Sequence, residues 1–322
     1  MCLLVVVHQV VPGAPLVVAA NRDERLDRPA RAMAVLADRD PRVLGGRDEV
    51  AGGTWLAVNE HGVVAGLTNE PTGEQRDATR RSRGELPVFL ARHRDAASAV
   101  EALVASARPS HYNPSWLLVG DRRRLLSVDM TGRSTAGDRP VAAELGPGVH
   151  VLENRPPGAP SAKVDHVRDL VAAALAEACD PGSPAIAGVP GGGGPAAGGS
   201  AAARVPGGDG PAAARVPGGG GAVSGPGDQH GAVAGEPGGG GAVAKLVASL
   251  ARILADHQVT ASDDAGGPLA RSACCVHGDE YGTRSALLVT VGERPSCLPS
   301  LQVADGRPCT ASFTDATAWW RC

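Results

Sequence analysis

Two runs of apolar, largely β-branched residues lie near the N-terminal end of the chain. They comprise Leu3–Val11 and Leu16–Ala20, and the sequence Val-Pro-Gly-Ala-Pro connects them. β-Branched residues favour strands, and proline and glycine favour a tight connection between strands. We therefore predict a buried β-hairpin, with Cys2 at the head of its first strand.

Two further pairs of apolar runs have the composition of hairpins in an antiparallel sheet. The first pair is Thr54–Asn59 and Val63–Thr68, which Glu-His-Gly connects. The second pair is Ser115–Gly120 and Leu125–Met130, which a short charged segment connects. These runs predict four more antiparallel strands.

In several other segments apolar residues recur at intervals of three and four positions, a spacing that is typical of one buried face of an α-helix. Val164, Val167 and Val171 show it in the longest of these segments. The predicted helices cover Gly84–His93, Ala96–Ala107, Ser161–Cys179 and about Ala244–His257. Hairpins combined with long helices predict a layered α/β protein, in the broad sense that includes α+β folds.

Residues 181–242 differ in composition from the rest of the chain and consist mainly of Gly, Pro, Ala and Val. The sequence Ala-Ala-Ala-Arg-Val-Pro-Gly-Gly begins at Ala201 and again at Ala212. Such a segment has too little bulky apolar surface to offset the entropy of ordering it. We expect a disordered, repeat-expanded insertion between two helices of a single domain that spans residues 1–322. A proline-rich spacer between two domains is the alternative.

Charge and hydropathy limit the partners and the compartment. The formal net charge is -3, so the chain lacks the basic field that nucleic acid attracts, and we expect no nucleic-acid partner. No run approaches the ~20 apolar residues of a membrane-spanning helix. The apolar stretch Cys2–Ala20 lacks the basic start of a signal peptide. A cytoplasmic protein without a transmembrane segment is therefore expected.

The cysteine pattern argues against two common structural roles. The seven cysteines are odd in number and irregularly spaced, and no C-x-x-C pair occurs. Disulfide scaffolds normally contain an even number of cysteines, and structural zinc sites normally contain closely spaced pairs such as C-x-x-C. We therefore predict neither a disulfide framework nor a metal site.

Cys2 is the leading candidate for chemistry, because the Walker P-loop, G-x-S-x-G, H-E-x-x-H and strand-linked G-x-G-x-x-G signatures are absent. Removal of Met1 would leave a thiol and a free α-amine on the same residue. The neutral amine can accept the thiol proton and return it to a leaving group, so no separate histidine is required. The alternative is that Cys2 is a small apolar residue that begins a core strand.

The polar sequence Asn21-Arg22-Asp23-Glu24 follows the second apolar run. In a hairpin, the return strand would bring these residues back beside Cys2. Arg22 would then lower the pKa of the thiol, and Asp23 would hold the ammonium form of the amine. The alternative is a solvated turn at the end of the strand.

Several further motifs occur in an order that resembles one family. The motifs are Met1-Cys2 before an apolar strand, Asn21-Arg22-Asp23-Glu24, Gly52-Gly53-Thr54-Trp55-Leu56-Ala57, Leu67-Thr68-Asn69, Ser82-Arg83-Gly84-Glu85-Leu86, Asn113-Pro114, Leu117-Leu118-Val119-Gly120-Asp121 and Tyr281-Gly282-Thr283-Arg284-Ser285. In these motifs the chain resembles the NRDE family, also called the transport and Golgi organisation protein 2 family. The resemblance covers most of the chain outside the insertion.

The resemblance implies a four-layer αββα fold of the N-terminal-nucleophile hydrolase type with antiparallel sheets, related to choloylglycine hydrolases and penicillin V acylases. It also implies a hydrolase that cleaves a linear amide bond of a small acylated substrate and needs no cofactor. The implied site residues are Cys2 as nucleophile and base, Arg22 and Asp23 as its electrostatic neighbours, Asn69 and Asn154 as oxyanion donors, and Arg284 as a late arginine that closes the site. Alternatively, Asn69 is a turn former and Arg284 an ion-pair partner of Asp279 or Glu280.

The same family is associated with haem trafficking and with acyl-CoA or lipid handling, in which no bond is cleaved, so a binding function stays open. Haem would need axial ligands, and Cys274, Cys275 and His277 lie together in the sequence. In a strand, Cys275 and His277 would share a face. The alternative is that the cysteines are buried apolar residues and that His277 belongs to a turn. Because aromatic residues make up only 2% of the chain, a haem pocket would have to be aliphatic.

Overall fold

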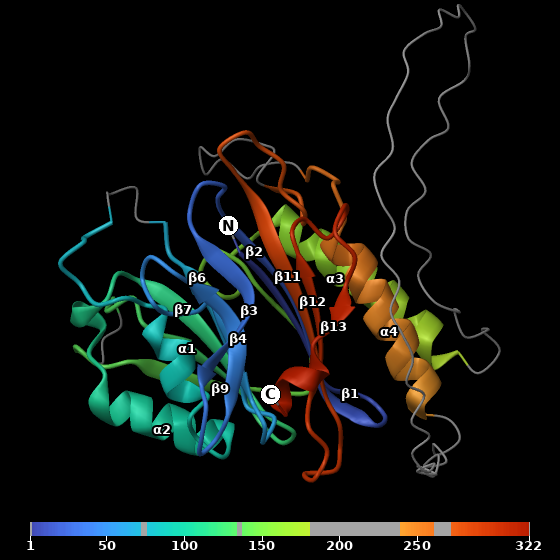
Figure 1. Cartoon of the computed structure of the whole chain (residues 1–322), viewed down its shortest axis with the longest axis horizontal. Coiled ribbons are helices and arrows are strands. Elements are labelled where there is room, and N and C mark those ends of the chain that lie inside the picture. Colours follow the sequence, from blue (N-terminus) through green and yellow to red (C-terminus); the bar gives the residue numbers. More distant parts are fainter. Residues whose placement is uncertain (1, 72–75, 134–136, 181–238, 261–271, 322) are drawn as a thin grey trace, which may run out of the picture.

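Two antiparallel β-sheets lie face to face in the computed structural model, with a pair of helices on each outer side (Figure 1). The structure describes residues 2–71, 76–133, 137–180, 239–260 and 272–321. Across these residues the layers follow the order helix, sheet, sheet, helix. The predicted four-layer αββα fold with antiparallel sheets is therefore confirmed.

Sheet A carries the N-terminal hairpin in its centre. Its strands, in spatial order, are β10 (Gly148–Leu152), β1 (Leu3–Val11), β2 (Ala14–Arg25), β11 (Tyr281–Val291), β12 (Ser300–Asp305) and β13 (Thr314–Asp315). β1 and β2 pair antiparallel from Leu3 opposite Asn21 to Val11 opposite Ala14, so the predicted hairpin is confirmed. β11, which lies far along the chain, pairs with β2 over most of its length.

Sheet B is built from strands that follow one another in the sequence. In order they are β3 (Ala30–Ala37), β4 (Val43–Asp48), β5 (Leu56–Asn59), β6 (Val64–Asn69), β7 (Ser115–Gly120), β8 (Leu125–Asp129) and β9 (Val141–Leu145). The two predicted hairpins form β5–β6 and β7–β8 and are confirmed. β5 begins at Leu56 and not at Thr54, because the Thr54 hydroxyl is engaged with the main chain of Leu56 before the strand starts.

The other strands of the two sheets were not predicted. β9 is short and almost entirely exposed, and its sequence Val-Ala-Ala-Glu-Leu has few bulky apolar residues. β3 and β4 contain alanine, glycine and arginine in place of β-branched residues, and their pairing depends on their neighbours in the sheet. No element was predicted at β11, although Ala286–Val291 is an apolar run.

The alternation of side chains along β1 divides its residues between two cores. Successive side chains of a strand point to opposite faces of the sheet. Leu4 and Val6 pack against sheet B, in a core that also contains Trp116. Leu3 and Val5 pack on the other face, against helices. Both faces of β1 are thus buried over Leu3–Val7, which explains the uninterrupted apolar run of these five residues.

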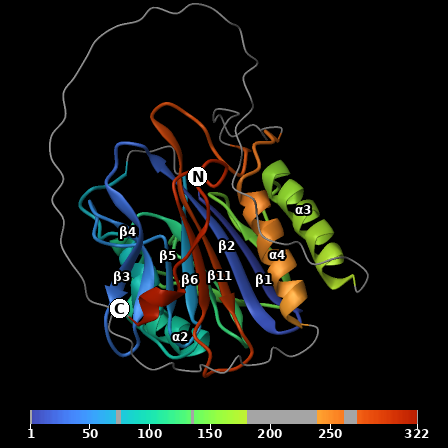
Figure 2. The same cartoon turned by 45° about the vertical axis from the view of Figure 1, so that its right-hand side comes forward.

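Helices cover the outer face of each sheet. On sheet A these are α3 (Ala162–Cys179) and α4 (Gly239–Leu254), which lie side by side in Figure 2, and on sheet B they are α1 (Glu85–Leu90) and α2 (Ala96–Ser106). His166, near the start of α3, is hydrogen-bonded to Asp256, just after α4, with Nε2 and Oδ2 2.7 Å apart. α3 and α4 therefore run antiparallel. Two short 3₁₀ helices cover Pro109–His111 and Thr317–Trp320.

The four predicted helices are confirmed, with shifted ends. α3 begins after Ser161, whose hydroxyl accepts a hydrogen bond from the N–H of Val164 and caps the helix. α4 begins at Gly239 and not at Ala244, so residues 239–242 belong to a helix and not to the predicted insertion. The remainder of that insertion, residues 181–238, lies outside the described residues. Among the helices that the structure describes, none is long and apolar enough to cross a membrane.

Candidate active site

Cys2 lies where the first strand of sheet A begins, at one end of the interface between the two sheets (Figure 1). β1 pairs with β2 on one side and with β10 on the other. Continued to Cys2, the register of these pairs places Arg22 on one side of the cysteine and Asn154 on the other. Alternation directs all three side chains to the face of Leu4, which packs on sheet B.

The sequence Asn21-Arg22-Asp23-Glu24 lies inside a strand and not beyond its end. β2 extends to Arg25, and Asn21, Arg22 and Asp23 are buried. The predicted end of the strand at Ala20 is therefore wrong, and so is the alternative of a solvated turn. The physical reason is β11, which pairs with this part of β2 and satisfies its main-chain groups.

Arg22 is held inside the protein by an aromatic ring and two carboxylates. Its guanidinium carbon lies 4.7 Å from the centre of the Trp55 ring. Its Nη2 lies 3.5 Å from Oε2 of Glu24 and 3.7 Å from Oδ2 of Asp48, and only 4% of the side chain is exposed. A buried guanidinium of this kind requires such partners. They hold its positive charge beside Cys2.

Cys2 as a residue is half-buried, and the pKa of its buried thiol lies above the usual value for cysteine. Burial is the main cause because it disfavours the charged thiolate, and the negative charge of Asp23 acts in the same direction. The backbone N–H of Asp23, which donates a hydrogen bond to the thiol, and the positive charge of Arg22 lower the pKa. The balance leaves the thiol protonated at neutral pH, so a reaction at Cys2 requires a base.

Asn21 and Asp23 point to the opposite face of sheet A, toward the helices. The side-chain amide of Asn21 donates hydrogen bonds to the carbonyls of Leu254 and Cys274, at 2.8 and 2.9 Å. The carboxylate of Asp23 accepts a hydrogen bond from the Thr283 hydroxyl at 2.6 Å. Asp23 is therefore connected to the thiol through its main chain and to the C-terminal part of the chain through its side chain.

Asn154 connects the two sheets at this end of the interface. Its side-chain amide donates a hydrogen bond to the main-chain carbonyl of Asn69, at 2.7 Å. The preceding Glu153 points away, toward the start of α3, where its carboxylate accepts a hydrogen bond from Ser161 and lies 3.7 Å from Nε of Arg155. Asn69 and Asn154 are thus brought together, and the buried charge of Glu153 is kept on the other face of the sheet.

Arg83 is a second arginine near Cys2 that was not among the residues predicted for the site. Its Nη1 donates a hydrogen bond to the carbonyl of Pro114 at 3.0 Å, and the same carbonyl accepts from the N–H of Glu70 at 3.1 Å. Burial, together with the charge of Arg76, lowers the pKa of Arg83 to about 10, whereas Cys2 raises it. The guanidinium therefore lies within electrostatic range of the thiol. Its position inside one of the family motifs was the signal that could have identified it.

Arg284 is engaged with the turn that follows β2. Its Nη1 donates hydrogen bonds to the carbonyls of Arg25, Leu26 and Arg28, the first at 3.0 Å and the last at 3.2 Å. These partners are main-chain carbonyls and not the nearby carboxylates considered from the sequence. The contacts hold the turn after β2 in place.

The structure separates Cys274 from Cys275 and His277, the two other residues considered as haem ligands. The Cys274 side chain packs in the apolar core under α3 and α4, and burial raises its pKa to about 11. Cys275 and His277 lie in an irregular segment before β11, not in a strand, and are joined there by His257 and Cys309. These four residues have no recognisable spacing in the sequence, so the cluster was missed when no metal site was predicted.

Comparison with known proteins places this site in a family. The sequence profile described as Transport and Golgi organisation 2 matches residues 1–186. The Transport and Golgi organization protein 2 homolog of Bos taurus is 35% identical over 146 residues, which are 43% of this chain and 50% of that protein. The chain therefore spans about half the length of this relative.

Solved structures with a related arrangement are more distant in sequence. A penicillin V acylase from Agrobacterium tumefaciens is 11% identical, with 98% of each chain covered and a TM-score of 0.39. The Caenorhabditis elegans N-acylethanolamine-hydrolyzing acid amidase ortholog is 13% identical, with 55% of this chain and 79% of that chain covered and a TM-score of 0.37. The family profile, in contrast, matches more than half of the 322 residues, including Cys2 and the whole of β2. The chain belongs to the Transport and Golgi organisation 2 family.

Proposed function

We propose that the protein is an N-terminal cysteine hydrolase that cleaves a linear amide bond in a small acylated substrate. The observation that supports this most directly is the setting of the Cys2 thiol, which accepts a hydrogen bond from the N–H of Asp23 and lies beside the buried charge of Arg22. Cys2 as a residue is half-buried and lies at the start of β1, next to Arg22 of β2. The chain's own groups account for every step of this reaction.

In the first half of the proposed reaction, Cys2 with a free α-amine attacks the substrate. The neutral amine accepts the thiol proton while sulfur bonds to the carbonyl carbon, and the carbonyl oxygen becomes an oxyanion. The resulting ammonium gives the proton to the amide nitrogen, the C–N bond breaks, and the amine product leaves. The raised pKa of the thiol agrees with this sequence, because the proton then leaves as the S–C bond forms.

In the second half, water hydrolyses the thioester. The amine accepts a proton from water as its oxygen attacks the carbonyl carbon, the C–S bond breaks, and the proton returns to sulfur as the acid product leaves. Arg22 stabilises negative charge on sulfur. The oxyanion has two candidate donors. One is the N–H of the Asn154 side-chain amide that is not bonded to the Asn69 carbonyl, and the other is the side-chain amide of Asn69.

The test is a panel of N-acyl amides assayed on wild-type protein and on Cys2→Ala, with intact mass measured on the same samples. We expect the wild type to have lost Met1 and to release amine, and Cys2→Ala to lose at least about 10³-fold in kcat/KM. Cys179→Ala is the matched control, because Cys179 is an exposed free thiol at the end of α3. That variant should keep full activity. Amide cleavage by Cys2→Ala, or by protein that retains Met1, would contradict the proposal.

The alternative proposal is binding of haem or acyl-CoA beside Cys2 without bond cleavage. It needs neither a free amine nor a thiol nucleophile, so binding should be the same in wild type and Cys2→Ala. Haem absorbance and acyl-CoA titration on both proteins, with no amine released from any amide, would favour this alternative. Cys275 and His277 favour a metal ion over haem, because their donor atoms lie within 4.8 Å of those of His257 and Cys309.

A further inference from the structure

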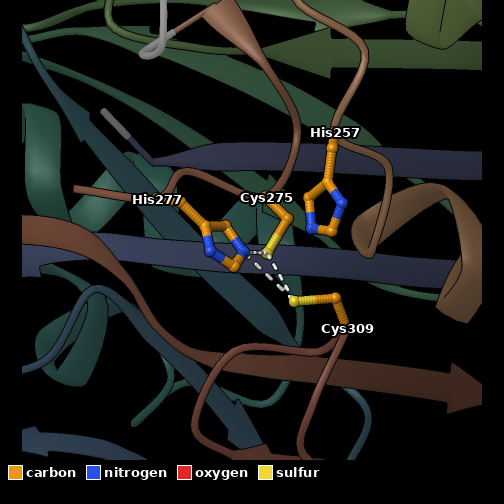
Figure 3. Close-up of side chains that lie close together, drawn as sticks. All are labelled: His257, Cys275, His277 and Cys309. Carbon is orange, nitrogen blue, oxygen red and sulfur yellow. Dashed lines mark hydrogen bonds between the residues drawn. The ribbon is translucent and has the colours of Figure 1, made fainter. Parts of the chain in front are cut away.

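Four side chains that can bind a metal converge beside the C-terminal end of α4. They are His257 after α4, Cys275 and His277 in the segment before β11, and Cys309 in the loop after β12. One donor atom from each residue lies within 4.8 Å of the others. Figure 3 shows both sulfur atoms and both imidazole rings directed toward a common centre.

The distances among three of these donor atoms are close to those between the ligands of a tetrahedral zinc ion. Sγ of Cys275 lies 3.6 Å from Sγ of Cys309 and 3.6 Å from Nε2 of His277, and that nitrogen lies 3.2 Å from Sγ of Cys309. With Zn–S of ~2.3 Å and Zn–N of ~2.0 Å, neighbouring ligands of a tetrahedron are about 3.3 to 3.8 Å apart. The ring of His257 lies edge-on to that of His277, with centroids 4.7 Å apart, and its donor nitrogen lies within 4.8 Å of the other three donor atoms.

We propose that His257, Cys275, His277 and Cys309 bind one Zn²⁺ ion. Two thiolates and two imidazoles are a donor set of structural zinc sites, whereas Mg²⁺ and Ca²⁺ prefer oxygen ligands. The two thiolates also neutralise the double charge of the ion, which suits a site next to an apolar core. Because the protein supplies all four ligands, no coordination position is open to water, and the site is structural.

The main chain next to Cys275 provides a donor to a metal-bound thiolate. The N–H of Cys309 donates a hydrogen bond to the sulfur of Cys275. Outer-shell hydrogen bonds of this kind orient and stabilise a coordinating thiolate.

The ion would join the segments after α4, before β11 and after β12, and the second of these segments is connected to Asp23 of β2 through Thr283. The N–H of Val276, next to Cys275, donates a hydrogen bond to the Thr283 hydroxyl at 2.8 Å, and this hydroxyl donates to Asp23 at 2.6 Å. Metal bound at Cys275 would thus hold the peptide that positions Asp23. The zinc proposal stands on the four ligands and is independent of whether Cys2 cleaves a substrate.

A disulfide is the competing use of the same two sulfur atoms. The 3.6 Å between Cys275 and Cys309 is a non-bonded distance, well above the ~2.05 Å of a disulfide, and both residues are free cysteines. Oxidation of this pair would remove two of the four ligands. The disulfide and the zinc-bound state therefore exclude each other. The mass of the protein and its zinc content distinguish them.

The test uses the full-length protein, expressed with Zn²⁺ in the medium and purified under reducing conditions. We expect about one zinc ion per chain by mass spectrometry of the metal and, at the zinc absorption edge, two sulfur and two nitrogen ligands. Cys309→Ser and His257→Ala should each lower the retained zinc at least about 10-fold after dialysis against a chelator. Cys297→Ser is the matched control, since Cys297 is an exposed free cysteine outside the cluster, and it should retain zinc.

Cobalt gives a second readout on the unmutated chain, which covers the case of a variant that fails to fold. Apo-protein titrated with Co²⁺ should develop the visible bands of tetrahedral cobalt and a thiolate-to-cobalt charge-transfer band. Four results would overturn the proposal: reduced wild type with neither zinc nor these bands, zinc bound without sulfur ligands, unchanged zinc in folded Cys309→Ser, or a Cys275–Cys309 disulfide in freshly purified protein.

Discussion

At the scale of single residues, alternation along a strand decides which groups reach the Cys2 thiol. Arg22 and Asn154 share the face of Cys2, whereas the carboxylates of Asp23 and Glu153 lie on the other face. A shift of one residue in register would exchange the two sets. The thiol therefore experiences a buried cation on its own face and receives from Asp23 a main-chain N–H.

Replacement of Arg22 should make the thiol of Cys2 a weaker acid. The positive charge of Arg22 favours the thiolate, so Arg22→Gln is expected to raise the pKa of Cys2 and to move the midpoint of its alkylation profile up by roughly one pH unit. The measurement is iodoacetamide labelling against pH, read at the Cys2 peptide by mass spectrometry. Cys179 in the same samples is the internal control, and an unchanged or lower midpoint at Cys2 would contradict the expected effect.

Gly46 leaves room for the Trp55 ring, which supports Arg22. A Cβ at this position would overlap the Trp55 side chain, over which the guanidinium lies. We expect Gly46→Ala to lower the free energy of unfolding by about 1 to 3 kcal/mol, because the ring must move in a packed core. Denaturant unfolding measures the effect. Gly146→Ala is the control, because a Cβ there meets no heavy atom within 4 Å, and an equal loss in both variants would argue against a clash.

At the scale of elements, Asp48 joins the end of β4 to the turn after β2. Its Oδ1 accepts hydrogen bonds from the N–H groups of Val50 and Ala51, both at 3.0 Å, and its Oδ2 accepts from Nε of Arg28 at 2.8 Å. Burial by itself would raise the pKa of Asp48, but these N–H groups and the charge of Arg28 outweigh it and lower the pKa. The folded protein therefore stabilises the ionised carboxylate.

Loss of the Asp48 carboxylate should lower the stability of the fold at neutral pH and change it little at acidic pH. A carboxyl group with a lowered pKa stabilises the fold fully above its unfolded pKa of about 3.9, and the contribution disappears as pH falls through the folded value. We expect Asp48→Asn to lower the free energy of unfolding by about 1 to 3 kcal/mol at pH 7, with the difference from wild type shrinking below about pH 4.

Urea unfolding of both proteins at several pH values checks this pH dependence. Glu49→Gln is the matched control, because Glu49 forms an exposed pair with Arg31 and its loss should change stability by less than about 0.5 kcal/mol. A difference between Asp48→Asn and wild type that stays constant from pH 7 to acid would show that the charge of Asp48 is not what stabilises the fold.

At the scale of the whole molecule, α3 and α4 form an antiparallel pair on sheet A. The pairing of His166 with Asp256 lies at the start of α3 and at the end of α4. Cys179 and Gly239 are therefore at the same, opposite end of the pair. Among the described residues, the buried side chains of both helices pack on β1 and β2 and cover the outer face of this sheet.

Replacement of residues 181–238 by a short Gly-Ser linker should leave the described fold intact. Because a shorter connection costs less closure entropy, we expect the free energy of unfolding to stay equal or to rise by about 1 to 2 kcal/mol. Thermal and denaturant unfolding measure this. A longer deletion that extends through Leu246, a fully buried residue of α4, is the control and should destabilise strongly. Loss of cooperative unfolding in the shorter deletion would contradict the expected independence.

The N-terminal hairpin, two hairpins of sheet B and the four helices were predictable, because runs such as Leu3–Val11 and caps such as Ser161 act over a few neighbouring residues. The candidate residues Cys2, Arg22 and Asn154 were predictable from ordered family motifs. Arg83 lay in one of those motifs, but its place near the thiol was not predictable. That place depends on a hydrogen bond to the carbonyl of Pro114, which is distant in the sequence.

By itself, the sequence determined the strand that begins at Cys2, the helices that flank the sheets and the family. The tertiary structure alone decided that Asn21, Arg22 and Asp23 are buried in a strand paired with β11, that Arg284 holds a turn, and that four metal-binding side chains converge. These side chains are His257, Cys275, His277 and Cys309. The reason is physical. Hydrophobic runs, caps and turns are local, whereas these contacts join residues far apart in the chain and depend on sheet register and on the packing of the layers.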